Sequence, residues 1–195
     1  MKQNKTNKKF VYLISPNKIP NINFYDDLAL VLSSKKISFF QLRLKKETNS
    51  NKLIIGKKIK KICNKYKVKF LINDDPLLAK KLNADGCHLG QKDMDLIKAR
   101  KILKNKIIGV TCHNSINLAK RAINDGADYL AFGAFYATKT KTVKYRASLT
   151  VLKSIKKITS LPIVAIGGIK LNNYKKLLLN KANFLAISGY IWNNK

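Results

Sequence analysis

The sequence predicts a single-domain α/β fold, a compact (β/α)8 barrel of the TIM type, and three observations lead to that prediction. Eight short apolar, β-branched runs alternate with longer segments of helical period. The runs end in polar residues, and nothing between them resembles a linker. Strands that alternate with helices pair in parallel through right-handed crossovers, and eight such units close into a barrel. An open, doubly wound sheet is the alternative, and the repeat count of eight favours the barrel.

The expected elements follow one another without a break. The eight strands are Phe10–Ser15, Ile37–Leu44, Val68–Asn73, Gly86–Leu89, Ile107–Thr111, Tyr129–Phe135, Pro162–Ile166 and Phe184–Ser188. Amphipathic stretches predict helices, among them Lys52–Tyr66, Leu77–Leu82, Asp95–Leu103, Ile116–Asp125 and Leu149–Ile158. Polar residues open several helices and Gly126 closes one, as helix capping requires. The chain ends soon after Trp192, so we expect the final helix to be short or missing.

Length and composition limit the class of protein. The chain has 195 residues, which suits one domain, and 46% of them are apolar, which excludes a disordered basic tail. No apolar run approaches the roughly 20 residues of a membrane span, so no membrane partner is expected. Residues 1–9 are expected to form a flexible basic tail without a secretory signal, and residues 10–195 the catalytic domain. The cysteines, Cys63, Cys87 and Cys112, form no CxxC pair, which favours buried packing roles in a reducing cytoplasm.

The formal net charge is +30, from 40 Lys and Arg against 10 Asp and Glu. The arginines are only Arg43, Arg100, Arg121 and Arg146, and the lysines are spread along the whole chain. Nucleic-acid binders tend to cluster charge on one face and to use Arg. We therefore expect a solvated lysine coat that attracts anionic substrates, and no specific nucleic acid. A basic nucleic-acid-binding barrel remains the alternative from another functional class.

Barrel enzymes place their chemistry at the carboxyl ends of the strands. At the end of the second strand, alternation puts Gln41, Arg43 and Lys45 on one face. Cations beside an amide at a barrel mouth predict a grip on a phosphorylated ligand. A solvated polar face is the alternative interpretation.

Half of the ten acidic residues, namely Asp74, Asp75, Asp85, Asp93 and Asp95, fall within 22 residues, and several of them follow two neighbouring strands. Paired carboxylates in so basic a protein predict a hard cation, most plausibly Mg²⁺. Asp75 and Asp95 precede expected helices and are assigned to capping. Asp74 and Asp93 are therefore the candidate metal ligands.

Other polar residues follow the later strands. His88 is expected to be an inward-facing, hydrogen-bonded residue rather than a catalyst, and Thr111 to place a hydroxyl at the mouth. Nothing in the sequence indicates that the Cys112 thiol is activated.

Three loops carry groups that bind anions. The loop after the sixth strand offers Thr138, Thr140 and Lys141. The seventh and eighth strands end in Gly-Gly and Ser-Gly, which include Gly168 and Ser188, where barrels of this kind bind phosphate. Two anion sites with a metal site between them predict chemistry that joins two phosphorylated small molecules.

The order of these motifs resembles the thiamine phosphate synthase family. The matching stretches are QLRLK at 41–45, INDD at 72–75, ADGCHLGQKD at 84–93, GVTCH at 109–113, TKTK at 138–141, AIGGI at 165–169 and AIS at 186–188. The resemblance implies coupling of hydroxymethylpyrimidine diphosphate to thiazole phosphate, with dissociative, Mg²⁺-assisted loss of pyrophosphate before the thiazole nitrogen attacks.

The resemblance also implies a role for each matching residue. The pyrimidine diphosphate would be held by Gln41, Arg43, Lys45, Asn73, Thr111 and Lys141, of which Arg43, Lys45 and Lys141 would be catalytic. Asp74 and Asp93 would hold Mg²⁺. The thiazole phosphate would be held by Thr138, Thr140, Gly168, Ile187 and Ser188.

The chain departs from the family pattern in a few places. Thr111 replaces the usual Ser, and Ala137 replaces a common Pro. The segment 180–184 lacks the usual glycines, which bears on the thiazole phosphate side and on closure of the barrel. The related thiazole tautomerase shares the fold but needs no diphosphate grip, so retention of that grip favours the synthase.

Overall fold

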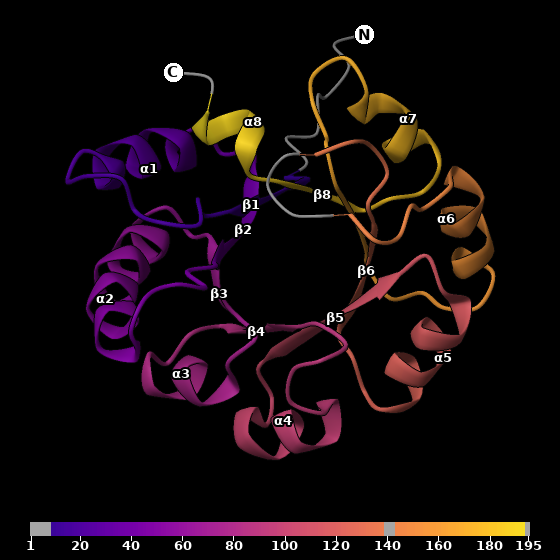
Figure 1. The fold of residues 1–195 in the computed structure, drawn as a ribbon, viewed down its shortest axis with the longest axis horizontal. Helices are drawn as coiled ribbons and strands as arrows, with labels where there is room; N and C mark the ends of the chain where they lie inside the picture. Colours follow the sequence, from indigo (N-terminus) through magenta and orange to yellow (C-terminus); the bar gives the residue numbers. More distant parts are fainter. Residues whose placement is uncertain (1–8, 139–142, 194–195) are drawn as a thin grey trace, which may run out of the picture.

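The structure is a closed barrel of eight parallel strands surrounded by helices (Figure 1). It is a computed structural model that describes residues 9–138 and 143–193. The strands lie in chain order, and β8 pairs with β1 to close the ring, with Val11 opposite Leu185. The predicted barrel is confirmed, and the open doubly wound sheet is wrong.

The strands and helices alternate along the whole chain. The strands are β1 Val11–Ile14, β2 Ile37–Leu42, β3 Lys69–Asn73, β4 Gly86–Leu89, β5 Ile107–His113, β6 Tyr129–Gly133, β7 Ile163–Ile166 and β8 Phe184–Ile187. The helices are α1 Phe24–Ser33, α2 Asn49–Lys65, α3 Pro76–Lys81, α4 Leu96–Leu103, α5 Ile116–Asn124, α6 Leu149–Lys156, α7 Tyr174–Leu179 and α8 Gly189–Trp192.

Strands β2 and β6 each end two residues earlier than the sequence predicts, because their next backbone groups bond elsewhere. Strand β2 ends at Leu42, and the following N–H, that of Arg43, donates to Ser15 Oγ at 2.9 Å. Strand β6 ends at Gly133, and the N–H of Ala134 donates to the carbonyl of Tyr145 at 3.1 Å. The polypeptide thus leaves the sheet at the end of each of these two strands.

The last helix, α8, is short, as predicted, and it is fastened to the first strand. Trp192 Nε1 donates to the carbonyl of Ile14 at 2.6 Å, and its ring lies 5.0 Å from the ring of Phe24 in α1. Helix α8 therefore covers the junction of β8 and β1, near the labelled C-terminus in Figure 1. Helices α1 and α7 were not among the predicted stretches, and neither has a side-chain hydrogen bond at its N-cap.

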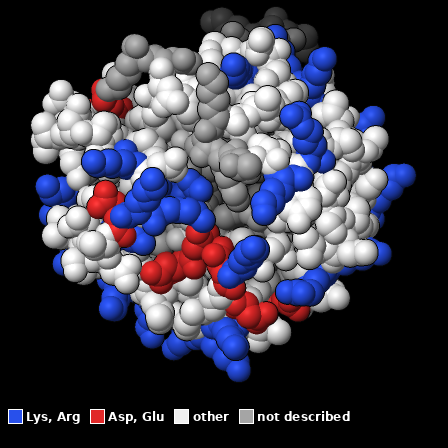
Figure 2. Space-filling view, viewed as in Figure 1, with Lys and Arg blue, Asp and Glu red and all other residues white. Residues whose placement is uncertain are grey.

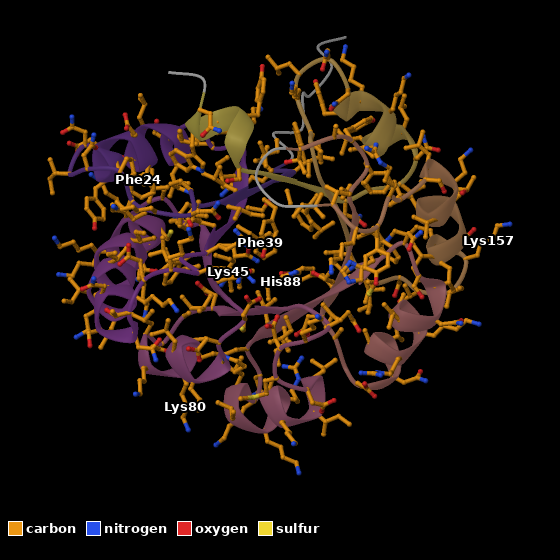
Figure 3. The ribbon with its side chains drawn as sticks, in the orientation of Figure 1. Phe24, Phe39, Lys45, Lys80, His88 and Lys157 are labelled. Carbon is orange, nitrogen blue, oxygen red and sulfur yellow. The ribbon has the colours of Figure 1, made fainter. Side chains whose placement is uncertain are left out.

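The interior of the barrel is packed with large side chains. Tyr12, Leu71, Tyr129 and Val164 are buried together, with Phe39 packed against them. A larger apolar cluster fills the space between the strands and the helices. Figure 3 shows Phe39 inside the ring of strands, whereas Lys80 and Lys157 lie at the periphery. The lower part of the barrel is thus a packed core, and the mouth is the end at which barrels of this kind bind ligands.

Three matching contacts, which we call the strand clamps, fix the end of the barrel opposite the mouth. Each clamp joins the residue just before β4, β6 or β8 to one residue of the preceding strand through two hydrogen bonds. The side chain of the first residue accepts the backbone N–H of the second, and the backbone N–H of the first donates to the carbonyl of the second at 2.8 Å. The clamps join Asp85 to Phe70, Asp128 to Ile108 and Asn183 to Ile163, through side-chain bonds of 2.9, 2.7 and 2.9 Å. Segment 180–184 therefore supports closure of the barrel rather than weakening it.

Other expectations concern the ends and the cysteines. Of the expected basic tail, residues 1–8 lie outside the described residues, and the carbonyl of Lys9 accepts a hydrogen bond from Ser38 Oγ at 3.0 Å. Cys63, Cys87 and Cys112 are buried free thiols, in agreement with their expected packing role. Within residues 9–138 and 143–193, no helix has both the length and the apolar character to cross a membrane.

Candidate active site at the mouth of the barrel

Polar side chains line the interior just below the mouth. Gln41, Asn73, His88 and Thr111 lie near the carboxyl ends of β2, β3, β4 and β5, and the ladder places Asn73 directly beside His88. Figure 3 shows His88 near the centre of the ring of strands. Both ring nitrogens of His88 are hydrogen-bonded, to Tyr129 and Thr111, so the expected inward-facing histidine is confirmed.

Arg43 and Lys45 follow β2 at the rim. The guanidinium of Arg43 donates to Asn17 Oδ1 in the loop after β1, while its backbone N–H is held by Ser15. Burial lowers the pKa of Arg43 and the nearby Asp74 acts against this shift, yet a guanidinium in a protein stays charged. Ser15 and Asn17 were missed by sequence reasoning, although their place directly after the first strand is a signal.

The candidate metal ligands face one another. The carboxyl groups of Asp74 and Asp93 are in hydrogen-bond contact, and Lys45 Nζ lies 3.0 Å from Asp74 Oδ2. The N–H of Asp74 donates to the carbonyl of His88 at 2.8 Å, and Asp93 Oδ2 accepts the N–H of Gly90 at 2.7 Å. The predicted pair is thus brought together from two loops.

The electrostatics of this pair suit a divalent cation. Burial acts to raise the pKa of Asp74, but the hydrogen bond with Asp93 and the Lys45 ammonium outweigh it, so this pKa lies below its usual value. Burial, followed by the neighbouring Asp74, raises the pKa of Asp93. A second negative charge here is costly, and a cation between the carboxylates would remove that cost.

The donor set also fits Mg²⁺. This ion takes one or two carboxylates and keeps waters or ligand phosphate oxygens for the rest of its octahedron. Across the described parts of the chain, no group of three or more His, Cys, Asp or Glu side chains is placed to share a metal. Substrate and water would therefore supply the remaining oxygens.

The other aspartates of this cluster are engaged by backbone groups. Asp75 Oδ1 accepts the N–H of Leu78 and Asp95 Oδ1 accepts that of Ile97, each at 2.9 Å, so both predicted caps are confirmed. Asp85 belongs to a strand clamp at the opposite end. Figure 2 shows acidic side chains gathered between β4 and α4 on a face otherwise rich in Lys and Arg.

The opposite side of the mouth is formed by the loops after β6, β7 and β8. The N–H of Tyr136 donates to the carbonyl of Gly167 at 3.1 Å, so the chain after β6 runs beside the end of β7. Gly168 has φ of +61°, and a Cβ there would lie 2.2 Å from the carbonyl oxygen of Ala137. Only glycine fits this crossing of two loops.

The remaining residues predicted on this side are partly placed. Ile187 ends β8, and Ser188 Oγ donates to the carbonyl of Ser15 at 3.1 Å. Thr138 is half-buried in the described chain, whereas Thr140 and Lys141 lie outside the described residues.

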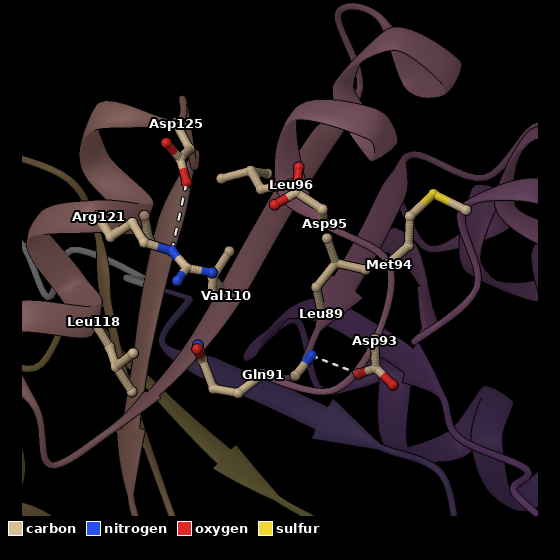
Figure 4. Close-up of a pocket in the computed structure, with 12 residues that line it drawn as sticks. Leu89, Gln91, Asp93, Met94, Asp95, Leu96, Val110, Leu118, Arg121 and Asp125 are labelled. Atoms are coloured by element: carbon tan, nitrogen blue, oxygen red, sulfur yellow. Dashed lines mark hydrogen bonds and ion pairs between the residues drawn. The ribbon is translucent and has the colours of Figure 1, made fainter.

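A separate cleft of about 130 Å³ lies beside the mouth, between α4 and α5 (Figure 4). Asp93 and Gln91 border it, and Gln91 Nε2 donates to the carbonyl of Thr111 at 2.5 Å. The Arg121 guanidinium in this cleft is paired with Asp125 at 3.8 Å. Gln91, which sequence reasoning did not single out, ties the loop after β4 to the end of β5.

Comparison with known proteins agrees with this geometry. The model of a family described as thiamine monophosphate synthase matches residues 11–191. A thiamine-phosphate synthase of Pelagibacter ubique is 97% identical over 195 residues, covering 100% of this chain and 94% of that protein. One from Nitrosomonas eutropha is 38% identical over 179 residues, covering 91% and 84%. The solved thiamine phosphate pyrophosphorylase of Pyrococcus furiosus superposes with a TM-score of 0.81 at 28% identity, covering 94% of this chain and 87% of that one.

Proposed function

Because the chain belongs to the thiamine monophosphate synthase family, we propose that its barrel mouth joins hydroxymethylpyrimidine diphosphate to thiazole phosphate and releases pyrophosphate. The activity itself, the transfer that forms thiamine phosphate, is that of the family and of a relative 97% identical to this chain. The observation that carries the proposed site is the meeting of Arg43, Lys45, Asp74 and Asp93 at the ends of β2 to β4.

The diphosphate would lie against this charged group. The guanidinium of Arg43 is hydrogen-bonded to Asn17 and its backbone N–H to Ser15, so the guanidinium is already oriented before an anion binds. Lys45 pairs with Asp74, within reach of the same anion. Lys141 would add a third cation, as the resemblance implies. Gln41, Asn73 and Thr111 would hold the pyrimidine below the diphosphate.

Asp74 and Asp93 would hold Mg²⁺ next to Lys45. When bound, this ion supplies positive charge to the oxygens of the departing diphosphate. Lys45 and Arg43 stabilise the same charge from the protein side.

The reaction needs no protein nucleophile. The bond from the pyrimidine methylene carbon to the diphosphate oxygen breaks, and its electron pair leaves with pyrophosphate. The lone pair of the thiazole nitrogen then forms the new carbon–nitrogen bond. The cysteines play no part, since burial raises the pKa of Cys112 to about 12 and also raises those of Cys63 and Cys87.

The thiazole phosphate would be held across the barrel from the metal site. Its ligands would be Thr138, Thr140, Gly168, Ile187 and Ser188. Backbone N–H groups after β7 and β8 face this position in barrels of this kind, and Gly168 allows the loop to approach closely.

The direct test is an assay for thiamine phosphate with purified protein and both substrates, with Mg²⁺ present or chelated. We expect product that depends on Mg²⁺. A folded protein that binds thiazole phosphate but forms no product would contradict the proposal and point to a tautomerase.

Lys141→Ala tests the third cation. Turnover should fall about 100-fold, the usual effect of removing one electrostatic stabiliser of a transition state. The KM for thiazole phosphate should change little. A loss of turnover within about threefold, or roughly 0.65 kcal/mol, would show that Lys141 has no such role.

The proposed setting of the enzyme is the cytoplasm, because three buried free thiols suit a reducing compartment. Its partners would be the two phosphorylated substrates and no specific nucleic acid. Tight nucleic-acid binding with a steep salt dependence would contradict this.

A further inference from the structure

A continuous chain of hydrogen bonds crosses the interior of the barrel beneath the mouth. Gln41 Nε2 donates to the hydroxyl of Tyr12 at 2.9 Å, and that hydroxyl lies 2.8 Å from the hydroxyl of Tyr129. The Tyr129 hydroxyl lies 2.8 Å from His88 Nδ1, and His88 Nε2 lies 2.8 Å from Thr111 Oγ1. The chain links five strands and ends on two residues proposed to hold the pyrimidine.

The two tyrosines in this chain of hydrogen bonds are buried and tightly packed in the barrel interior. Tyr12 and Tyr129 are 2% and 3% exposed, so their hydroxyls exchange partners with water only when the core opens. A Cβ on Gly109 would lie 1.8 Å from the ring of Tyr129, so the glycine in β5 is what lets this ring lie across the strand. The ring of His88 stacks on Tyr129 at 5.6 Å.

The donors of the chain can be counted. A tyrosine hydroxyl has one proton to give. The Gln41 amide donates to Tyr12, which directs the Tyr12 proton to Tyr129 and the Tyr129 proton to His88 Nδ1. A neutral imidazole that accepts at Nδ1 carries its proton on Nε2 and donates it to Thr111. Burial raises the pKa of both tyrosines, so each keeps its proton.

We propose that Tyr12, Tyr129 and His88 are positioning residues, which fix one orientation of the Gln41 amide and of the Thr111 hydroxyl through this chain. In that orientation the amide oxygen of Gln41 is the acceptor left for a ligand, and the hydroxyl proton of Thr111 is the donor. A ligand with an exocyclic amino group and a ring nitrogen, such as an aminopyrimidine, matches both. Turning the Gln41 amide over would require every hydrogen bond of the chain, as far as Thr111, to exchange its donor and acceptor. The inference rests on the proposed roles of Gln41 and Thr111.

The first test reads the imidazole directly and needs no substrate. The protein has two histidines, so ¹⁵N spectra of the labelled chain show two rings, and His88→Gln assigns them. We expect His88 to be protonated at Nε2 alone, and Tyr129→Phe to give a mixture of tautomers. Protonation at Nδ1, protonation at both nitrogens, or spectra that Tyr129→Phe leaves unchanged would overturn the proposal.

The second test separates positioning from stability. Tyr129→Phe should raise the KM for the pyrimidine diphosphate about tenfold, as the loss of one oriented hydrogen bond does, and leave the KM for thiazole phosphate within about twofold. Tyr12→Phe should do the same and serves if Tyr129→Phe does not fold. Tyr25→Phe, a tyrosine in α1 that is not part of the hydrogen-bond chain, is the control and should change neither constant.

Equal rises in both constants, or none, would overturn the positioning role. Wild-type protein that forms thiamine phosphate in the same assay shows that the proposed function stands independently of this result.

Discussion

Aspartates at the two ends of the barrel have the same side chain and opposite surroundings. At the closed end, Asp85 and Asp128 each accept a backbone N–H and pair with one cation, Lys69 at 2.9 Å and Arg100 at 2.7 Å. At the mouth, Asp74 and Asp93 contact each other. A carboxylate with fixed partners stabilises the fold, while two carboxylates that face each other leave charge for a cation to neutralise.

The largest effect should come from Asp93→Asn at the mouth. The amide oxygen can still accept the N–H of Gly90, so the loop keeps its bond while the charge is lost. We expect turnover to fall about 100-fold and the Mg²⁺ concentration for half-activity to rise at least tenfold. The thermal midpoint should stay nearly constant. An unchanged Mg²⁺ titration would remove Asp93 from the metal site.

The converse change is Asp128→Ala at the closed end. It leaves the buried N–H of Ile108 without its side-chain acceptor and removes the partner of Arg100, which should cost about 2 kcal/mol of unfolding free energy. The KM values and turnover of the folded fraction should be unchanged. Denaturant unfolding and steady-state kinetics on one preparation check both. A loss of turnover without a loss of stability would erase the contrast between the two ends.

A smaller effect is expected from Asn183→Ala, the uncharged clamp before β8. Only a neutral hydrogen bond to the N–H of Ile163 is lost, about 1 kcal/mol of unfolding free energy. Asn183→Asp, which keeps the acceptor, is the matched control and should recover most of the loss. If alanine and aspartate behave alike in denaturant unfolding, the side-chain bond contributes nothing.

The smallest effect should come from Lys69→Gln. Lys69 pairs with Asp85, but its side chain is 59% exposed, and exposed ion pairs contribute little. We expect a change of less than about 0.5 kcal/mol, further reduced at high salt. A change above 1 kcal/mol would mean that the cation, rather than the backbone bond, carries this clamp.

Most of the architecture was predictable from the sequence, because eight apolar runs of strand length and the helical stretches between them leave few topologies. The roles of Asp75 and Asp95 as caps were also predictable, since capping depends on the residues next in the chain. The pairing of Asp74 with Asp93 followed from their places after neighbouring strands.

What could not be predicted depends on contacts distant in sequence. The hydroxyls of Tyr12 and Tyr129 meet across the barrel, although the residues read as apolar members of two buried strands. Ser15 and Asn17 orient Arg43 only because β1 and β2 lie side by side. Asn183 occurs where the family's glycines are missing, and its pattern resembles that of Asp85 and Asp128 only once all three clamps are seen.

The clamps recur before β4, β6 and β8, and each follows an alanine whose N–H donates to a carbonyl in the last turn of the preceding helix. These alanines are Ala84, Ala127 and Ala182, with bonds of 2.9, 2.9 and 3.1 Å. The barrel thus contains repeated units, each of which fixes the register of two neighbouring strands at the end opposite the mouth. Loops at the mouth can change length and chemistry during evolution without shifting the strands beneath them. New substrates are therefore accessible to this scaffold at little risk to its fold.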